Sequence, residues 1–391
     1  MISISHPQTH YSRKLAEALA EINLLNKFYT ATFFEPEKFK LLPPSIRKKL
    51  SKGYNPNIPN FSVSNFWLFE LIWRSAYPLI THSFYYKLNF FNLWGFDSVI
   101  ASKIKKDKSK IFIGFENSSF NTFKRAKTMG KKIVLEAPST HYKHQLKYYH
   151  PKFSNSFLNK IIYRKEKEIE LADYIITTSS FPAETYRENC PDKRIIPILL
   201  GVDTSKFQYI AKNNADNYFR YLFAGNITYA KGIDLLVKAF SKINNPRMKI
   251  ILAGAAGDAI NLCSKDNRIN YLGMLSHNEL INLYHKCDVL VLPSRLDGAA
   301  AVVFEAMATG TPTIVSTHTG AKDLITNGVN GWIFPDGNVD ELKNTMLNIY
   351  ENRDKLNVYG KAAAETVKEF TWDRYKKNIQ EFYSNLLSEI N

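Results

Sequence analysis

Short apolar runs alternate with longer amphipathic stretches along most of this chain. In the first half, helical spacing appears at residues 13–22, where Leu15, Leu19 and Ile22 fall on one face, and again at 157–171. The apolar runs there are too short for helices and predict strands. These runs are residues 2–5, 110–116, 131–137, 174–179 and 194–199.

The second half repeats this alternation. Its helical stretches are residues 232–243 and 279–287, and its strand-like runs are residues 218–224, 248–253, 269–272, 289–293 and 313–316. Strands that alternate with helices are typical of parallel sheets covered by helices. We therefore predict an α/β protein with two Rossmann-like domains.

The best linker candidate is residues 200–217, which contain Gly201 and a polar run at 212–217. It separates a predicted N-terminal domain, residues 1–200, from a C-terminal domain, residues 201–370. Residues 371–391 predict a final amphipathic helix that must bury its apolar stripe. The stripe consists of Trp372, Tyr375, Ile379, Phe382 and Leu386.

Composition narrows the class of protein. With 391 residues, 45% apolar and 23% charged, the chain suits two globular domains and excludes disordered or fibrous classes. Cys190, Cys263 and Cys287 show no zinc-like spacing and predict buried thiols in a reducing compartment. The N-terminus lacks signal-peptide features and no run reaches ~18 apolar residues, so we expect a cytoplasmic location.

The net charge of +16 is concentrated in the N-terminal half. Residues 1–200 hold 31 Lys+Arg against 16 Asp+Glu, whereas the remainder holds 21 against 20. A basic half beside a neutral half suggests that one domain faces an anionic partner such as membrane lipid, a phosphorylated acceptor or nucleic acid. Ordinary solubility charge is the alternative.

Residues 61–96 hold 13 aromatic residues and few charges, and five lysines follow between Lys103 and Lys110. Interfacial helices use this mixture, which makes peripheral contact with an anionic membrane one interpretation. A domain core or the wall of an acceptor pocket is the other.

Residues 294–313 carry the most informative chemistry. Asp297 and Glu305 stand eight residues apart around the small residues Gly298, Ala299, Ala300 and Ala301. The apolar stretch that follows predicts a helix ended by Gly310, and a helix start lined with small residues attracts phosphate.

Each part of this segment fits one part of a nucleotide sugar. Asp297 can accept hydrogen bonds from sugar hydroxyls. Glu305, about two turns into the helix, reaches a ribose when the diphosphate lies at the helix start. The alternative is an ordinary helix with close-packed alanines.

This segment resembles the C-terminal half of retaining glycosyltransferases of family four (glycosyl transferases group one), whose signature is Glu, seven residues, Glu. The resemblance implies the GT-B fold, in which two Rossmann-like domains face a central cleft and a C-terminal helix returns to the first domain. Further matching stretches are residues 200–203, 223–227, 231–236, 320–325, 330–335 and 370–375.

Four positions depart from the family pattern. Asp297 replaces the first Glu, and Ala299 and Ala300 replace an aromatic residue and a glycine. Asn226, after Gly225, replaces a phosphate-binding Arg. Lys231 is then the cation that matches the motif, and the resemblance implies that donor phosphate binding depends on it. A solvated lysine at a helix start is the other interpretation of Lys231.

The first domain offers weaker candidates. His10, in the loop after the first strand, could donate to a phosphate or an acceptor hydroxyl. Glu116, at a strand end, could help to hold the acceptor. His141 is the candidate for the family histidine close to the donor sugar, through its imidazole or its backbone carbonyl. A solvated loop histidine and an unrelated strand-end carboxylate are the alternatives for His10 and Glu116.

The implied reaction is sugar transfer from a nucleoside diphosphate sugar, UDP or GDP, with retention at the anomeric carbon. Lys231, Asn226 and backbone N–H groups would stabilise the leaving diphosphate, and Asp297 would orient the sugar. The donor is a substrate, and no cofactor or metal is implied, since the chain contains no Asp-x-Asp pair. The family suggests a glycan or lipid-linked acceptor in bacterial surface polysaccharide synthesis, such as lipopolysaccharide, capsule or exopolysaccharide.

Three rival functions stay open. A GT-B nucleotide-sugar epimerase or hydrolase would share the architecture. A dehydrogenase could use Gly254-Ala255-Ala256-Gly257, but the full Gly-x-Gly-x-x-Gly is missing. A nucleic-acid-binding protein would explain the basic half, but no recognised module appears, and we expect no nucleic-acid partner.

Overall fold

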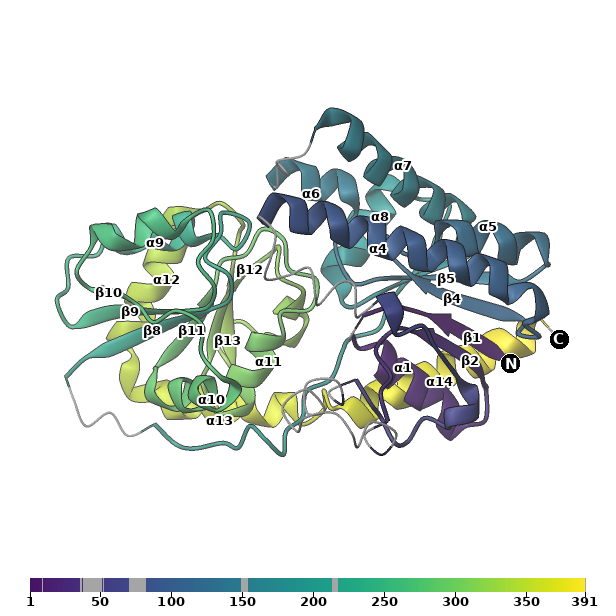
Figure 1. Ribbon diagram of the computed structural model, residues 1–391. Coiled ribbons are helices and arrows are strands. Elements are labelled where there is room, and N and C mark those ends of the chain that lie inside the picture. Colours follow the sequence, from purple (N-terminus) through teal and green to yellow (C-terminus); the bar gives the residue numbers. More distant parts are fainter. Residues whose placement is uncertain are drawn as a thin grey trace.

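The structure, a computed structural model, describes residues 1–8, 10–35, 37, 51, 53–69, 82–148, 154–212 and 217–390 (Figure 1). It contains two parallel sheets, of seven and six strands, and helices cover both faces of each sheet. The chain completes the first sheet before it enters the second, so the two sheets belong to two Rossmann-like domains.

The first sheet has the strand order β3-β2-β1-β4-β5-β6-β7. Its strands are β1 (Ile2–Ser5), β2 (Leu25–Thr30), β3 (Val63–Asn65), β4 (Ile111–Phe115), β5 (Lys132–Ala137), β6 (Tyr174–Thr177) and β7 (Arg194–Pro197). Its helices are α1 (Ser12–Glu21), α4 (His82–Lys103), α5 (Phe120–Thr128), α6 (Tyr142–Tyr148), α7 (Asn155–Leu171) and α8 (Ser180–Asn189), with 3₁₀ turns η2 (Asn60–Ser62) and η4 (Ile104–Lys106).

Side chains that point alternately to the two faces of β4 divide the core of the first domain into two layers. Ile111 and Ile113 pack with α1 on one face, whereas Phe112 packs with α4 and α5 on the other. Successive strand residues point to opposite faces, so a strand that is apolar throughout is buried on both sides.

The second sheet has the strand order β10-β9-β8-β11-β12-β13. Its strands are β8 (Phe219–Ala224), β9 (Met248–Ala253), β10 (Ile269–Tyr271), β11 (Val289–Leu292), β12 (Thr313–Ser316) and β13 (Gly331–Phe334). Its helices are α9 (Ile233–Ser241), α10 (His277–Lys286), α11 (Ala301–Ala308), α12 (Val339–Glu351) and α13 (Leu356–Val367), with 3₁₀ turns η5 (Ile260–Lys265), η6 (Gly320–Leu324) and η7 (Arg353–Lys355).

The last helix, α14 (Trp372–Glu389), returns to the first domain and lies along α1 (Figure 1). Lys376 Nζ lies 2.6 Å from Glu21 Oε1, and Gln380 Nε2 donates to the carbonyl of Ala18 at 3.0 Å. Of the predicted stripe, Tyr375, Ile379 and Leu386 are buried and Trp372 and Phe382 partly so. The returning helix expected from the resemblance is therefore present.

The chain passes between the two domains twice, and the two connecting segments lie side by side. The N–H of Val202 donates to the carbonyl of Phe370 at 3.0 Å. In the predicted linker, residues 213–216 lie outside the described residues. Lys212 anchors it to the second domain, because its ammonium donates to the carbonyls of Tyr284 and Cys287 at 2.6 and 2.7 Å. Burial lowers the Lys212 pKa to about 8.

Candidate active site

Two loops at the carboxyl ends of β8 and β11 carry Lys231 and Asp297. These strands are neighbours and parallel, so their following loops meet at one edge of the sheet. The Lys231 ammonium contacts Asp297 Oδ2, and the two side chains are 27% and 13% exposed. The structure thus brings together Lys231 and Asp297, two of the charged residues that the sequence singled out.

Glycine makes the close packing of these loops feasible. Gly232 ends the Lys231 loop with a φ of +74°, and a Cβ there would lie 1.8 Å from the carbonyl oxygen of Pro293. Only a residue without a side chain fits so close to another backbone. Gly225, at the start of the same loop, has a φ of +148°.

The start of α11 lies directly beside Asp297. Asp297 Oδ1 accepts the N–H of Ala300 at 2.8 Å, and Ala300 adopts the left-handed conformation with a φ of +51°. That N–H is therefore already bonded to the carboxylate. Gly298 and Ala299 precede it, and Ala301, which is exposed, begins the helix. The positive end of the helix dipole faces this loop.

Glu305 lies inside α11, apart from the Lys231 and Asp297 pair. Its Oε2 accepts the hydroxyl of Tyr284 at 2.9 Å. Burial raises the pKa of this carboxyl, and the Tyr284 hydrogen bond opposes that change. Asn226, by contrast, is exposed in the Lys231 loop, and its carbonyl accepts the N–H of Thr228 at 2.9 Å.

The two weaker first-domain candidates are packed inside that domain. The His10 ring lies 4.3 Å from Tyr11 and 5.4 Å from Phe115, centroid to centroid, and burial lowers its pKa to about 4. It is therefore neutral near pH 7. Glu116 accepts the hydroxyls of Ser139 and Tyr186, so its carboxylate is occupied within the domain.

His141, predicted to lie close to the donor sugar, is buried in the first domain. His141 is 2% exposed, and its Nε2 lies 3.7 Å from Cys190 Sγ. Its Nδ1 accepts the N–H of Lys143 at 3.3 Å, and its carbonyl accepts the N–H of His144 at 2.9 Å. Both groups proposed to contact the sugar thus have partners inside the first domain, because His141 stands at the start of α6.

Glu136, at the end of β5, is a buried carboxyl that the sequence reasoning missed. It accepts the hydroxyl of Tyr11 at 2.8 Å and that of Tyr383, from α14, at 3.4 Å. Burial raises its pKa to about 8. A charged residue that directly follows the apolar run of residues 133–135 was the signal for it.

The domains meet through direct polar contacts at the start of α8. Ser179 Oγ donates to the carbonyl of Gly298 at 2.5 Å. Asp323 accepts the N–H of Ser180 at 2.7 Å, and Lys322 Nζ lies 2.9 Å from Glu184 Oε2. The loop that carries Asp297 is therefore seated on the first domain.

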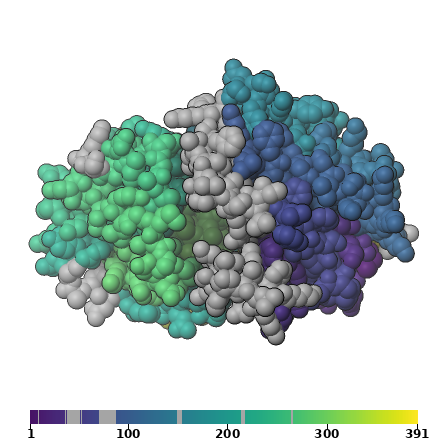
Figure 2. Space-filling view, in the orientation of Figure 1, coloured from purple at the N-terminus to yellow at the C-terminus, as the bar shows by residue number. Residues whose placement is uncertain are grey.

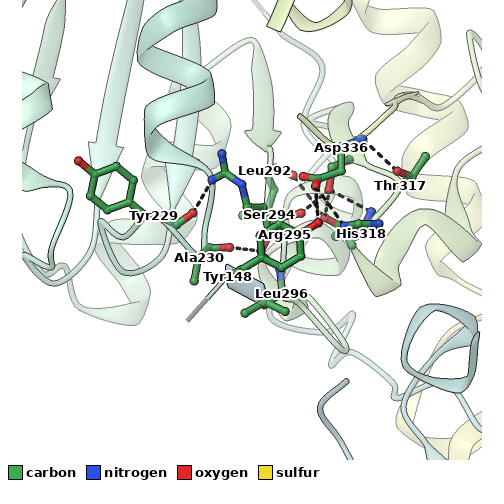
Figure 3. A network of polar contacts seen from close by, with 12 residues as sticks. Tyr148, Tyr229, Ala230, Leu292, Ser294, Arg295, Leu296, Thr317, His318 and Asp336 are labelled. Carbon is green, nitrogen blue, oxygen red and sulfur yellow. Dashed lines mark hydrogen bonds and ion pairs between the residues drawn. The ribbon is translucent and has the colours of Figure 1, made fainter. Parts of the chain in front are cut away.

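A second contact links α6 to the carboxyl ends of β12 and β13 (Figure 3). The Tyr148 hydroxyl lies 3.4 Å from Asp336 Oδ2, and His318 Nδ1 lies 3.2 Å from the same oxygen. The rings of His318 and His144 are 5.1 Å apart. Sequence spacing gave no signal for this group, because its members come from both domains.

On the face shown in Figure 2 the first domain, coloured purple through blue to teal, lies at the right, and the second domain, coloured teal to green, lies at the left. Lys231 and Asp297 belong to the second domain, at the carboxyl edge of its sheet. In open α/β sheets ligands bind outside that edge, which is where Lys231 and Asp297 lie.

Comparison with known proteins shows what the second domain is similar to. The family model for glycosyl transferases group 1 matches residues 205–366. An uncharacterized glycosyltransferase of Methanocaldococcus jannaschii is 24% identical over 366 residues, which cover 86% of this chain and 90% of that protein.

Two solved structures share the fold over the whole chain. Anabaena HepE, in complex with UDP-glucose, has a TM-score of 0.61 at 16% identity, covering 98% of this chain and 99% of that one. The lipopolysaccharide outer core galactosyltransferase WaaB has a TM-score of 0.62 at 16% identity, covering 99% of each chain. With the match over residues 205–366, these findings show that the chain has the GT-B fold and that its second domain matches the glycosyl transferases group 1 family.

Proposed function

We propose that this protein transfers a sugar, with retention, from a nucleoside diphosphate sugar to a hydroxyl of a glycan or lipid-linked acceptor. The observation that carries the proposal is the contact of Lys231 with Asp297 at the start of α11, with Glu305 further along the same helix. The UDP-glucose bound by the structurally similar HepE supports a UDP-linked donor.

The leaving diphosphate is the centre of the proposed mechanism. Negative charge develops on it as the glycosidic bond breaks, and preorganised donors stabilise that charge. Lys231, Asn226 and backbone N–H groups of Gly298, Ala299 and Ala301 supply these donors. The bound diphosphate competes with Asp297 for the Lys231 ammonium, which frees the Asp297 carboxylate to accept sugar hydroxyls.

The remaining residues orient the two ends of the donor. Glu305 accepts hydrogen bonds from the ribose, for which its carboxylate form is needed. The acceptor hydroxyl attacks from the face that the diphosphate leaves, and the departing phosphate takes its proton. No protein nucleophile and no metal enter this scheme.

A panel of UDP- and GDP-linked sugars tests the proposal. We expect one donor to raise the melting temperature and to release its nucleoside diphosphate when acceptor glycans are supplied. Lys231→Ala and Glu305→Ala should each abolish donor-dependent transfer with the fold intact. Lys238→Ala, an exposed lysine on α9, is the matched control. Full transfer by either site variant overturns the proposal, and product formation without any acceptor favours the epimerase or hydrolase.

The acceptor is proposed to belong to a surface polysaccharide pathway at an anionic membrane, reached from the cytoplasmic face. The name of the structurally similar WaaB, a lipopolysaccharide galactosyltransferase, supports the surface polysaccharide pathway.

Exposed apolar side chains in the first domain support the contact with an anionic membrane. Trp67, Leu68, Phe91 and Tyr163 are 48%, 56%, 57% and 51% exposed, and Lys103 and Lys160 accompany them. Rings with adjacent lysines suit an anionic interface.

Parts of the aromatic segment serve the core instead. Phe96 is fully buried, with Phe66 and Phe69 packed around it, while residues 70–81 lie outside the described residues. None of the described helices combines the length and apolarity that a membrane crossing requires.

Vesicle flotation tests the membrane contact. We expect binding to phosphatidylglycerol vesicles at low salt, weaker binding to phosphatidylcholine, and loss on Trp67→Ser with Leu68→Ser. Met274→Ser, which changes a 79% exposed methionine in the second domain, should leave binding unchanged. Indifference of the wild type to anionic vesicles rejects this contact, and retention on a polynucleotide resin instead would favour nucleic acid.

A further inference from the structure

Arg295 joins the two loops of the proposed donor site. It follows β11, and its guanidinium donates to both carboxylate oxygens of Asp234, Nη1 to Oδ1 at 2.7 Å and Nη2 to Oδ2 at 2.9 Å. Nη1 also donates to the carbonyl of Tyr229 at 2.6 Å (Figure 3). Such a bidentate pair fixes direction as well as distance.

Backbone contacts surround Lys231 on both sides. The N–H of Arg295 donates to the carbonyl of Ala230 at 3.0 Å, and Ser294 Oγ donates to the same oxygen at 3.3 Å. Gly232, the residue after Lys231, packs on the carbonyl of Pro293. Both chain neighbours of Lys231 are thus fixed to the segment that leads to Asp297.

The ion pair is largely buried. The side chains of Arg295 and Asp234 are 15% and 11% exposed. Asp234 also stands in the first turn of α9, where the positive end of the helix dipole stabilises its negative charge. Reduced exposure strengthens the attraction, and removal of one partner leaves the other charge uncompensated.

We propose that Arg295 is a positioning residue that holds Lys231 at the place where the donor diphosphate binds. This inference rests on the proposed function. The lysine stem has four flexible carbons, so its ammonium is placed only as well as its backbone is held. The need is greater here because Asn226 stands where the resembled family has a second cation.

The conservative variant Arg295→Lys separates this role from charge alone. It keeps the positive charge and loses the bidentate geometry. We expect the affinity for UDP or GDP, whichever the wild type binds, to fall about tenfold or more by calorimetry, because a small misplacement of a binding group has a large effect. Asp234→Asn, which breaks the same pair from the other side, should give the same result.

A matched control lies at the opposite edge of the same sheet. Arg268 and Asp266 form a comparable pair, 2.6 Å apart and 18% and 17% exposed, just before the amino end of β10. Arg268→Lys should lower the melting temperature about as much as Arg295→Lys and leave nucleotide affinity unchanged.

Combining Arg295→Lys with Lys231→Ala in one protein shows whether Arg295 acts through Lys231. We expect Arg295→Lys to weaken nucleotide binding in the wild type and to have no further effect in Lys231→Ala. If Lys231→Ala weakens binding but Arg295→Lys does not, or if the two effects add, this inference is wrong and the proposed function stands. If neither variant changes nucleotide binding, the proposed donor site itself is rejected.

Discussion

Gly298 and Pro138 bring the backbones of the two domains into direct contact. A Cβ on Gly298 would lie 1.9 Å from the carbonyl oxygen of Pro138. Gly298 follows Asp297, and Pro138 follows β5 in the first domain. The loop proposed to hold the donor sugar is therefore seated against the domain proposed to hold the acceptor, and its position depends on how closely the domains approach.

We predict that Gly298→Ala lowers sugar transfer by about two orders of magnitude, because the added methyl group must move the loop away from Pro138 by an ångström or more. Each domain should keep its fold, since the clash lies between them. Steady-state transfer and circular dichroism measure these outcomes. Gly95→Ala, inside α4, is the control, because its Cβ would meet only the Phe69 ring at 3.2 Å. Wild-type transfer by Gly298→Ala would contradict the close approach.

A second prediction concerns Asp323, which accepts the N–H of Ser180 at the start of α8 across the domain boundary. A carboxylate at a helix start contributes about 1 kcal/mol, a factor of roughly five in an equilibrium. Asp323→Ala should therefore shift the molecule toward an open arrangement, seen as a larger radius of gyration by small-angle scattering and a several-fold lower transfer efficiency.

The control for Asp323 is the neighbouring pair of Lys322 and Glu184. Their side chains are 20% and 48% exposed, and exposed pairs contribute little. Lys322→Ala should change neither the radius of gyration nor transfer. Equal behaviour of the two variants would show that the cap of α8 does not hold the domains together.

Most of the fold could be predicted because buried parallel strands are continuous apolar runs. Residues 248–253 and 313–316 were predicted as strands and are β9 and β12. β2 was missed because Asn26 and Lys27 interrupt its apolar pattern. Their partners lie far away in sequence: Asn26 Nδ2 donates to Ser3 Oγ at 3.0 Å, and Lys27 Nζ donates to the carbonyl of Phe61 at 2.5 Å.

The candidate site was predictable only where its residues share a motif. Asp297 was found from its spacing to Glu305 and Lys231 from the resemblance to the family motif, and the structure places Lys231 and Asp297 in contact. Arg295 and Glu136 were not assigned a role from any motif, since their roles depend on partners that folding brings together from distant segments. Tyr383, for example, reaches Glu136 from the last helix of the chain.

Glu136 predicts a specific pH dependence of stability. Its pKa is raised from 4.5 to about 8, so the folded state binds one more proton than the unfolded state between these values. The free energy of unfolding should therefore fall as pH rises through this window, by up to about 1.4 kcal/mol per pH unit. Glu136→Gln, which resembles the protonated form, should remove that part of the slope in urea titrations at pH 6, 7 and 8.

Two comparisons sharpen the Glu136 experiment. Glu168, whose pKa is raised to about 7, contributes a slope of the same sign in the wild type and in Glu136→Gln. Its contribution therefore cancels when the two slopes are subtracted. Glu351→Gln changes an exposed carboxylate and should leave the slope unchanged. A wild-type slope retained by Glu136→Gln would mean that Glu136 is ionised in the folded protein at neutral pH.

Tyr284 predicts how nucleotide binding responds to acid. Its hydroxyl, 2.9 Å from Glu305, favours the carboxylate, whereas burial raises the pKa of that carboxyl. If ribose binding needs the carboxylate, nucleotide affinity falls as pH falls through that raised pKa. Tyr284→Phe raises the Glu305 pKa further, so the affinity of this variant for nucleotide should begin to fall at a higher pH, as calorimetry with UDP or GDP between pH 5 and 8 would show.

The control is Tyr221→Phe, which removes a buried hydrogen bond to the carbonyl of Met346 and should follow the wild-type curve. Coincident curves for Tyr284→Phe and the wild type would remove Glu305 from the ribose site, because no other described contact links Tyr284 to the proposed donor.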